Sequence, residues 1–258
     1  MTEIACIIPA RMASSRLPGK PLLPLNGLPM ILHILERCRL YDRFSRVIVA
    51  TCDQEIYDAV TEHGGQAVMT SDRHLRCTDR VEEAVDLLDE DFHDVEFVVM
   101  VQGDEILVAP EMLGQIVDDY QRTGAPVINL VSRLHDSKDH QSVDTVKVVA
   151  TVNGKALYLS RSPIPSPARG EDSPVYQQTG IIGFTKDFLH QFSRLEPTPL
   201  EIAESVDMLR VVEHELELRC VFSDVETLGV DTAADAARAE EILAADPLSQ
   251  KYMPGDRS

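Results

Sequence analysis

The sequence predicts an α/β fold in which a mostly parallel sheet is flanked by helices and followed by a smaller antiparallel region. Short apolar runs alternate with amphipathic segments of about ten residues through the first half of the chain, the pattern of a parallel sheet. An Asn153-Gly154 turn between two strand-like runs indicates an antiparallel hairpin in the second half. With 258 residues and 44% hydrophobic content, the chain can form a sizeable core.

The expected elements of the first half follow one another in regular order. Uninterrupted apolar runs predict strands buried on both faces, and apolar residues at helical spacing predict the helices between them. Pro9 is expected to end the first strand, and Gly64-Gly65 to end the second helix. The expected strands are Ile4–Ile8, Val47–Ala50, Gln66–Met69 and Phe97–Val101, and the expected helices are Met30–Arg39, Gln54–His63, Asp79–Leu88 and Pro110–Tyr120.

The second half lacks this alternation. Its hairpin is expected from Val146–Val152 and Ala156–Leu159, and the proline-rich segment Ser162–Pro174 predicts a loop. Because no Gly/Ser-rich linker divides the chain, one domain is expected over 1–246, with halves of about 1–130 and 131–246. The other expected elements are the strands Val175–Phe184 and Leu218–Phe222, the helices Glu201–His214 and Asp235–Ala245, and a C-terminal tail, Pro247–Ser258.

The composition argues against several classes of function. The chain carries 43 acidic and 24 basic residues, a formal net charge of −19, which does not suit a nucleic-acid-binding protein or docking on an anionic membrane. No apolar run reaches the roughly 18 residues of a membrane-spanning helix, and Met1–Ala10 lacks a signal-peptide pattern. The five cysteines are scattered and predict reduced thiols rather than a zinc site. A cytoplasmic protein is therefore expected.

The first 40 residues depart from this acidic character. They contain five basic and two acidic residues, whereas the other 218 residues contain 19 basic and 41 acidic ones. Three of the five cations, Arg11, Arg16 and Lys20, fall in one loop after the first predicted strand, which suits the binding of a polyanion at one place. The other two, Arg37 and Arg39, lie on a predicted helix, where chance placement on a solvated face is an equal alternative.

The first loop has the composition of a triphosphate site. Pro9–Pro21 combines three cations, two serine hydroxyls and a glycine directly after a buried strand. It is not a Walker loop, because Pro21 follows Lys20 where that pattern requires Ser or Thr. Since ligands of parallel sheets bind at the carboxyl ends of the strands, four loops are expected to converge there. These loops are Pro9–Lys20, Thr51–Asp53, Thr70–Arg80 and Gln102–Ile106.

The pattern R-x-x-S-x-R-L-P-G-K-P-L, which begins at Arg11, resembles the 3-deoxy-manno-octulosonate (KDO) cytidylyltransferases, within the sugar-activating cytidylyltransferases. The resemblance covers roughly residues 3 to 243 and implies a Rossmann-like sheet of the nucleotide-diphospho-sugar transferase type. It also implies transfer of CMP from CTP to a small anionic acceptor, and a homodimer. Its further motifs are Asn26–Ile31, Val49–Thr51, Thr78–Arg80, Gln102–Glu105, Val146–Val149, Ala156–Pro165 and Gly229–Thr232.

The resemblance assigns roles to individual residues. Asp104 and Asp231 would hold Mg²⁺, a hard cation that prefers oxygen ligands; alternatively, Asp104 is a turn residue and Asp231 caps a helix. Arg80 would recognise or brace the nucleoside, or else pair with an acid of the scaffold. The predicted catalytic residues are Arg11, Lys20 and Asp104, and the predicted nucleotide-binding residues are Ala10, Arg11, Ser14, Arg16, Lys20, Thr78, Asp79, Arg80 and Gln102.

The acceptor half departs further from the family pattern. The family's Ser-Gly before Thr-Asp/Glu-Arg is Arg76-Cys77 here, and polar positions of its sugar site are apolar at Ile182 and Met208. Three acceptors or roles therefore remain open: KDO or a related 2-keto sugar acid, a phosphonate such as phosphonoformate, and a non-catalytic nucleotide-binding homologue. The residues expected to bind the acceptor are Arg161, Gln178 and Asp207.

Overall fold

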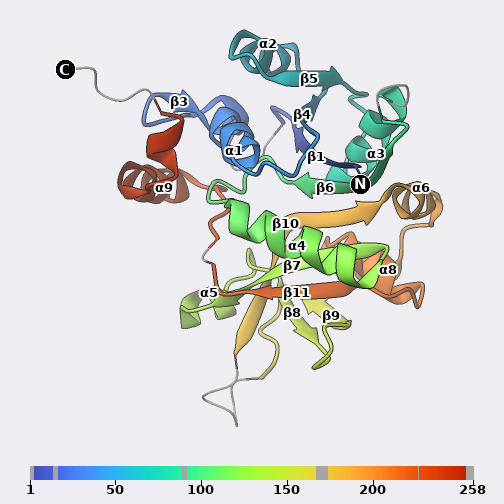
Figure 1. The fold of residues 1–258 in the computed structure, drawn as a ribbon. Coiled ribbons are helices and arrows are strands. Elements are labelled where there is room, and N and C mark those ends of the chain that lie inside the picture. Colours follow the sequence, from blue (N-terminus) through green and yellow to red (C-terminus); the bar gives the residue numbers. More distant parts are fainter. Residues whose placement is uncertain (1–2, 14–16, 89–91, 167–173, 226, 254–258) are drawn as a thin grey trace. The chain divides into compact units, whose positions relative to one another are not determined.

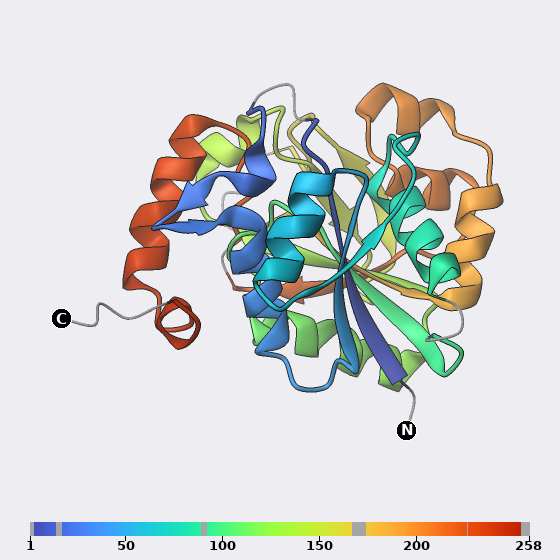
Figure 2. The same cartoon turned by 90° about the horizontal axis from the view of Figure 1, so that it is seen from above.

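The computed structural model describes residues 3–13, 17–88, 92–166, 174–225 and 227–253. The chain forms two compact units, one from Met1–Leu113 with Thr227–Ser258 and one from Gly114–Glu226. Figures 1 and 2 show the helices and strands of both units from two perpendicular directions. The second unit is therefore inserted, in sequence, between two parts of the first.

The first unit contains four parallel strands in the order β6-β1-β4-β5. Each strand contains the run predicted for it, and three of them extend beyond it. Their bounds are β1 (Glu3–Ala10), β4 (Arg46–Thr51), β5 (Gln66–Met69) and β6 (Val95–Val101). In the central strand β1, every residue from Ile4 to Ala10 is buried, as expected for a strand covered on both faces. Pro9 does not end this strand, which continues to Ala10.

Helices flank this parallel sheet, and the predicted alternation of strands and helices is confirmed. Gly65 explains where α2 ends: a Cβ there would lie 2.7 Å from Val60 Cγ1 and 2.8 Å from Val60 O, so only glycine fits this close turn. The helices are α1 (Met30–Arg39), α2 (Gln54–Glu62), α3 (Cys77–Leu87), α4 (Pro110–Thr123), which continues into the second unit, and α9 (Ala233–Ala245).

Two short elements of the first unit support the C-terminal part of the chain. The hairpin of β2 (Pro24–Leu25) and β3 (Leu28–Pro29) lies beside α9, and Asn26 N donates a hydrogen bond of 3.0 Å to Glu240 Oε1. Beyond α9, the short helix η3 (Ser249–Lys251) leads to Tyr252, which contacts His33 of α1. No helix among the described residues is long and apolar enough to cross a membrane.

The second unit contains mixed strands. Strand β7 (Val127–Leu134) pairs in parallel with β11 (Arg219–Ser223) on one side and antiparallel with β10 (Val175–Thr185) on the other. β10 also pairs antiparallel with β8 (Lys147–Ala150), which forms the predicted hairpin with β9 (Ala156–Ser160). The helices of this unit are α5 (Ser137–Gln141), α6 (Lys186–Arg194), α7 (Pro199–Glu204) and α8 (Met208–Glu213).

Two predicted elements of the second unit are wrong in extent. The single helix expected over Glu201–His214 is divided into α7 and α8, because Ser205 adopts a left-handed conformation with φ of 54°. The strand expected over Val146–Val152 ends at Ala150, and the turn of the hairpin is longer than two residues. Gly154 in this turn has φ of +83°, and a Cβ there would lie 2.7 Å from Cys220 O. The second difference thus involves a contact between residues distant in sequence.

Candidate active site

A cleft of about 280 Å³ lies at the carboxyl ends of β1 and β6 in the first unit. Its lining residues come from segments far apart in sequence: 9–21, 74–80, 102–104 and the single residue Asp231. The loop after β4 joins them through Asp53, whose Oδ2 accepts a hydrogen bond of 2.8 Å from Met12 N. The predicted convergence of four loops is therefore confirmed.

The strands β1 and β6 approach each other closely at the floor of this cleft. Gly103 N donates a hydrogen bond of 3.2 Å to Pro9 O. A Cβ at position 103 would lie 2.9 Å from the same Pro9 oxygen and 3.3 Å from Ala10 Cβ. A side chain at Gly103 would therefore push the two strand ends apart, and with them the neighbouring Gln102 and Asp104.

The centre of the cleft is a lysine between two aspartates. Lys20 Nζ lies 2.9 Å from Asp104 Oδ2 and 3.1 Å from Asp231 Oδ1. The side chain of Lys20 is 12% exposed, whereas those of Asp104 and Asp231 are 29% and 32% exposed. Burial tends to lower the pKa of Lys20, but the two carboxylates outweigh this effect and raise the pKa above its ordinary value. Lys20 is therefore a fully charged ammonium near neutral pH.

Backbone contacts bring the two aspartates together although 127 positions separate them in sequence. Glu105 and Gly229 form an antiparallel bridge, and Val230 N donates a hydrogen bond of 3.3 Å to Asp104 O. The alternative role of Asp231 as a helix cap is wrong, because Thr232 is the N-cap of α9 and its hydroxyl accepts a hydrogen bond from Asp235 N. The Asp231 carboxylate therefore faces Lys20 rather than the helix end.

Arg80 supplies a buried donor to the cleft. Its side chain is 2% exposed and lines the cleft from the first turns of α3. Nη1 donates to Thr70 Oγ1 and, at 3.2 Å, to Ser71 O, so the partners are a hydroxyl and a carbonyl rather than the scaffold acid weighed above. Nη2 is buried and has no hydrogen-bond partner among the described residues. A buried donor without a partner is costly, so this nitrogen has a hydrogen bond to give at the edge of the cleft.

The loop that precedes α3 is held in place by one acidic side chain, Glu83, and one basic side chain, Arg11. Glu83 Oε2 accepts hydrogen bonds from Ser71 N at 2.7 Å and from His74 Nε2 at 2.6 Å. On the opposite side, Arg11 Nη1 donates a hydrogen bond of 3.3 Å to His74 O across the exposed edge of the cleft. Arg11 thus contacts this loop as well as lining the cleft.

The remaining predicted nucleotide-binding residues fall into three groups. Ala10 and Gln102 line the cleft, as do Arg76 and Cys77, whose roles the sequence left open. Thr78 and Asp79 lie in the first turn of α3 and are not among the lining residues. Ser14 and Arg16 lie outside the described residues. Among the described residues, four Lys or Arg side chains and two carboxylates line the cleft. The basic residues are Arg11, Lys20, Arg76 and Arg80.

The two helical arginines of the basic N-terminal segment have structural partners. Arg37 is 3% exposed and donates a hydrogen bond of 2.6 Å to Val108 O, and it forms an ion pair with Asp246. Arg39 pairs with Glu36 at 2.8 Å. The polyanion-binding role therefore does not extend from the first loop to these arginines.

Arg161, a predicted acceptor-binding residue, is held by Glu204 in the second unit. Arg161 N donates a hydrogen bond of 2.8 Å to Glu204 Oε2, and its Nε donates one of 2.7 Å to Glu204 O. Burial tends to raise the pKa of Glu204, but hydrogen bonds from Arg161, Ser160 and Tyr158 outweigh it and lower the pKa. The sequence analysis missed Glu204, because its partners are about 40 residues away and no local pattern links them.

Gln178, the second predicted acceptor-binding residue, has a fixed amide orientation. Asn129 is 1% exposed, and its Nδ2 donates to Leu130 O, Thr179 O and Ile181 O, at 3.0, 3.1 and 3.2 Å. Asn129 Oδ1 therefore accepts from Gln178 Nε2, at 2.8 Å. This leaves Gln178 Oε1 to accept a hydrogen bond from elsewhere. The third predicted residue, Asp207, precedes the first turn of α8.

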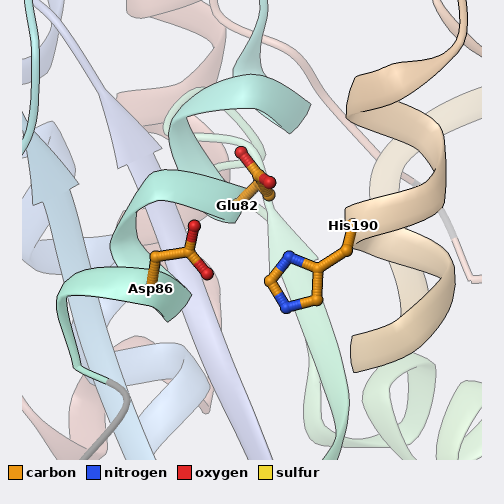
Figure 3. A group of neighbouring side chains, drawn as sticks. All are labelled: Glu82, Asp86 and His190. Carbon is orange, nitrogen blue, oxygen red and sulfur yellow. The ribbon is translucent and has the colours of Figure 1, made fainter.

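Three further side chains of metal-binding type lie on α3 and α6. Glu82 and Asp86 lie one turn apart on α3, and His190 lies on α6 (Figure 3). Helix α3 belongs to the first unit and α6 to the second. Asp104 and Asp231, by contrast, are two carboxylates of the first unit that line the cleft and contact the same Lys20 nitrogen.

Comparisons with known proteins agree on one family. The sequence profile described as "Cytidylyltransferase" matches residues 5–220. A 3-deoxy-manno-octulosonate cytidylyltransferase of Acaryochloris marina is 40% identical over 239 residues, which cover 92% of this chain and 96% of that protein. The enzyme of the same name from Syntrophobacter fumaroxidans is 41% identical over 249 residues, covering 95% and 99%.

Solved structures show the same relationship. A CMP:2-keto-3-deoxy-manno-octonic acid synthetase complexed with CTP has a TM-score of 0.86 and 33% identity, covering 94% of this chain and 99% of that one. A putative glucose-1-phosphate thymidylyltransferase from Bacillus anthracis, with a TM-score of 0.64 and 18% identity, shares the fold. The nucleotidyltransferase fold that the sequence predicted is therefore confirmed.

Proposed function

Because this chain belongs to the cytidylyltransferase family, we propose that it transfers CMP from CTP to KDO or a closely related 2-keto sugar acid. A hydroxyl oxygen of the acceptor would attack the α-phosphorus, forming a new P–O bond. The bond from that phosphorus to the bridging oxygen would break, and pyrophosphate would leave with its electron pair while the hydroxyl proton passes to solvent. The observation that carries the proposal is the Lys20–Asp104–Asp231 group in a cleft at the carboxyl edge of the sheet.

The charge of the cleft supports an anionic substrate. Four basic side chains and two carboxylates line it, on a chain whose formal net charge is −19. A triphosphate would be attracted to this positive region and repelled by the remaining surface. Guanidinium forks and an ammonium are also the donors that phosphate oxygens bind most strongly.

The positions of the lining residues suggest a division of roles. Arg11 and Lys20 would bind phosphate oxygens and hold the α-phosphorus in line for attack. The unpartnered Arg80 Nη2, together with Gln102, would receive the nucleoside, whose single base carbonyl oxygen and ring nitrogen N3 accept hydrogen bonds. The predicted residues Ser14, Arg16, Thr78 and Asp79 would complete or support this nucleotide site. Gly103 would keep the ends of β1 and β6 close together, and with them the lining residues Ala10 and Asp104.

The donor set at the centre of the cleft fits Mg²⁺. Asp104 and Asp231 each place one oxygen about 3 Å from the same Lys20 nitrogen, so the two carboxylates are close enough to share a cation. Carboxylate oxygens are the ligands that Mg²⁺ prefers, with phosphate oxygens and water completing the shell. When bound, Mg²⁺ would screen the negative charge that develops on the phosphates.

The acceptor is the least constrained part of the proposal. Arg161 donates from Nε and Nη1 to backbone carbonyl oxygens, so its Nη2 would be the group that pairs with an acceptor carboxylate. Gln178 Oε1 would accept a hydrogen bond from a sugar hydroxyl. Asp207, the N-cap of α8, is the third residue expected to bind the acceptor. The relatives reported above are named for KDO, and no observation favours a phosphonate. The intact set of Arg11, Lys20, Asp104 and Asp231 argues against a non-catalytic homologue. We also expect a homodimer, as the family resemblance implies.

Pyrophosphate release from CTP and Mg²⁺ tests this function, with KDO and phosphonoformate supplied in parallel. We expect release with KDO, and a loss of at least about 100-fold in Asp104→Asn, which keeps the side-chain volume but removes a metal-binding charge. Release with phosphonoformate alone would overturn the KDO assignment. CTP binding without release for either acceptor, unaffected by Asp104→Asn, would instead support the non-catalytic alternative.

A further inference from the structure

The Lys20 ammonium is bound to the same oxygens that a divalent cation would need. Its Nζ contacts Asp104 Oδ2 at 2.9 Å and Asp231 Oδ1 at 3.1 Å, so it uses one oxygen from each carboxylate. Both oxygens lie about 3 Å from the same nitrogen. A cation bridging the two aspartates would have to take the place of the ammonium or lie directly beside it.

We infer that Lys20 and a divalent cation compete for Asp104 and Asp231, so that the cation site opens when an anionic nucleotide draws Lys20 away. This inference rests on the proposed function, because it assumes that the two aspartates hold the cation. It goes beyond that function by assigning Lys20 a second role. In the ligand-free protein, Lys20 neutralises the paired carboxylates, and in the complex it neutralises phosphate.

Binding of Mg²⁺ and of the Lys20 ammonium to the same carboxylate oxygens is unfavourable for two reasons. Mg²⁺ binds oxygen at about 2.1 Å, so a shared carboxylate oxygen would bring it into close repulsive contact with an ammonium that is itself about 3 Å away. The site is also partly buried, with Lys20 only 12% exposed, so water screens this repulsion incompletely. The ammonium and a divalent cation therefore weaken each other's binding at these two carboxylates.

The local structure allows the ammonium to move without unfolding the loop. Lys20 begins the short helix η1 (Lys20–Leu22), after Gly19 in the left-handed region with φ of +72°. The backbone is fixed there by hydrogen bonds from Lys20 N to Leu17 O at 3.2 Å and from Leu23 N to Lys20 O at 3.1 Å. Only the flexible four-carbon side chain has to turn, and a triphosphate offers its nitrogen new charged acceptors.

The consequence is that the protein itself couples nucleotide binding to cation binding, so that each raises the affinity for the other. A nucleotide that takes Lys20 removes one positive charge from the two carboxylates, which raises their affinity for a cation. By linkage, a bound cation favours the nucleotide-bound position of Lys20. This coupling adds to any direct contact between cation and phosphate. It can be separated from that contact by measuring cation binding without nucleotide.

Binding of Mn²⁺ alone, measured by electron paramagnetic resonance, tests the inference without any catalytic readout. Mn²⁺ prefers the same oxygen ligands as Mg²⁺. We expect Lys20→Met to bind Mn²⁺ at least about tenfold more tightly than the wild type, because the competing ammonium is gone. Lys20→Arg keeps the charge and should bind Mn²⁺ as weakly as the wild type. Adding Asp104→Asn to Lys20→Met should remove the gain.

The outcomes separate the two proposals. The wild type and Lys20→Met could bind Mn²⁺ equally well, while Asp104→Asn abolishes binding in either background. That result would overturn the competition but keep the cation site. Absence of Mn²⁺ binding in all variants, with and without CTP, would overturn the cation site itself. Arg76→Met, which removes another positive charge from the same cleft, should change Mn²⁺ affinity by less than about twofold. A tenfold gain there would mean that charge alone, rather than contact, explains the effect.

A second measurement uses the wild type and does not depend on the folding of a variant. The ¹⁵N resonance of the Lys20 ammonium, observed by lysine-selective NMR, reports its ion pairs. We expect it to shift when CTP is added without metal, because the ammonium exchanges carboxylate for phosphate partners. A resonance that stays unchanged at saturating CTP would overturn the movement of Lys20.

Discussion

Gly103 shows how one missing side chain shapes the floor of the cleft. A Cβ at this position would lie 2.9 Å from Pro9 O, a backbone atom that cannot move without shifting β1. Its N–H already donates to that oxygen at 3.2 Å. The residue therefore holds together the strand ends that present Ala10 and Asp104.

Replacement of Gly103 by alanine should accordingly destabilise the protein by about 1–3 kcal/mol and weaken CTP binding, since the strand ends must separate. Urea denaturation and calorimetry measure the two effects. Gly229→Ala is the matched control, because a Cβ there meets nothing within 4 Å, and it should change the free energy of unfolding by less than about 1 kcal/mol. Equal effects of the two substitutions would contradict this account.

His33 is a buried histidine whose protonation state is defined by its partners. Its Nε2 lies 2.9 Å from Leu25 O, which only accepts, so Nε2 carries the proton and Nδ1 accepts from Tyr252 OH at 3.0 Å. Burial, and then the nearby Arg37 charge, lowers the pKa of His33 despite its backbone hydrogen bonds. The folded protein therefore favours the neutral ring.

This depressed pKa predicts a direction for the pH dependence of stability. The unfolded chain binds a proton at His33 below about pH 6.5, whereas the folded chain resists it, so stability is complete above that pH and falls as the pH decreases. His33→Gln cannot titrate. Between pH 7.5 and 5.5, the wild type should lose stability relative to this variant, as measured by urea denaturation at each pH. A constant difference between the two proteins would show that His33 does not titrate in this range.

At the scale of elements, the break between α7 and α8 is held by a buried ion pair. Arg210 Nη2 lies 2.6 Å from Glu201 Oε1, with side chains only 6% and 2% exposed. The Arg210 guanidinium also lies 4.5 Å from the centre of the Phe192 ring on α6. One residue thus links three short helices, none of which is long enough to be stable alone.

Removing one partner of this pair should be costly. Arg210→Met leaves the Glu201 carboxylate buried without its main counter-ion and should destabilise the protein by about 3–5 kcal/mol. The double variant Glu201→Leu/Arg210→Met should recover part of that loss, because no buried charge remains. Thermal unfolding of the single and double variants measures the coupling. Additive losses would indicate that the two side chains act independently.

The elements show what the sequence could and could not predict. All four parallel strands and the helices α1 to α4 were predictable, because apolar periodicity reports burial directly. The break at Ser205 was not, since the residues before and after it continue a helical pattern and the left-handed turn depends on contacts across α7 and α8. Strand β7 was missed because Asn129 and Ser132 interrupt its apolar run, although both are buried and hydrogen-bonded.

The candidate site, too, could be predicted only where a local sequence pattern marks its residues. The first loop could be predicted from its cations, and the resemblance indicated the two aspartates. The sequence could not show that Lys20 would bind both of them, that Asp53 would hold Met12, or that Glu204 would hold Arg161. Each of these contacts joins residues more than 40 positions apart and depends on how strands and loops meet in space.

At the scale of the whole molecule, the uneven distribution of charge predicts how salt affects substrate binding. The cleft collects four cations on a chain with a net charge of −19, so long-range attraction and repulsion both favour binding there. Raising NaCl from about 50 to about 500 mM should weaken CTP binding roughly tenfold, because screening shortens the range of these interactions.

Cytidine, which lacks phosphates, provides the control for this prediction. Its affinity should change less than about twofold over the same salt range, since it has no charge for the cleft to attract. Titration calorimetry at each ionic strength measures both ligands. Parallel losses for CTP and cytidine would mean that salt perturbs the protein rather than the attraction.

The order of segments along the chain has a consequence for synthesis on the ribosome. Lys20 and Asp104 are made before the inserted second unit, whereas Asp231 follows it, because the first unit consists of Met1–Leu113 and Thr227–Ser258. A nascent chain that has emerged only as far as residue 226 therefore carries the ammonium and one carboxylate of the cleft, but lacks the other. The second unit can fold as soon as it emerges, while the cleft becomes complete only in the final stage of translation.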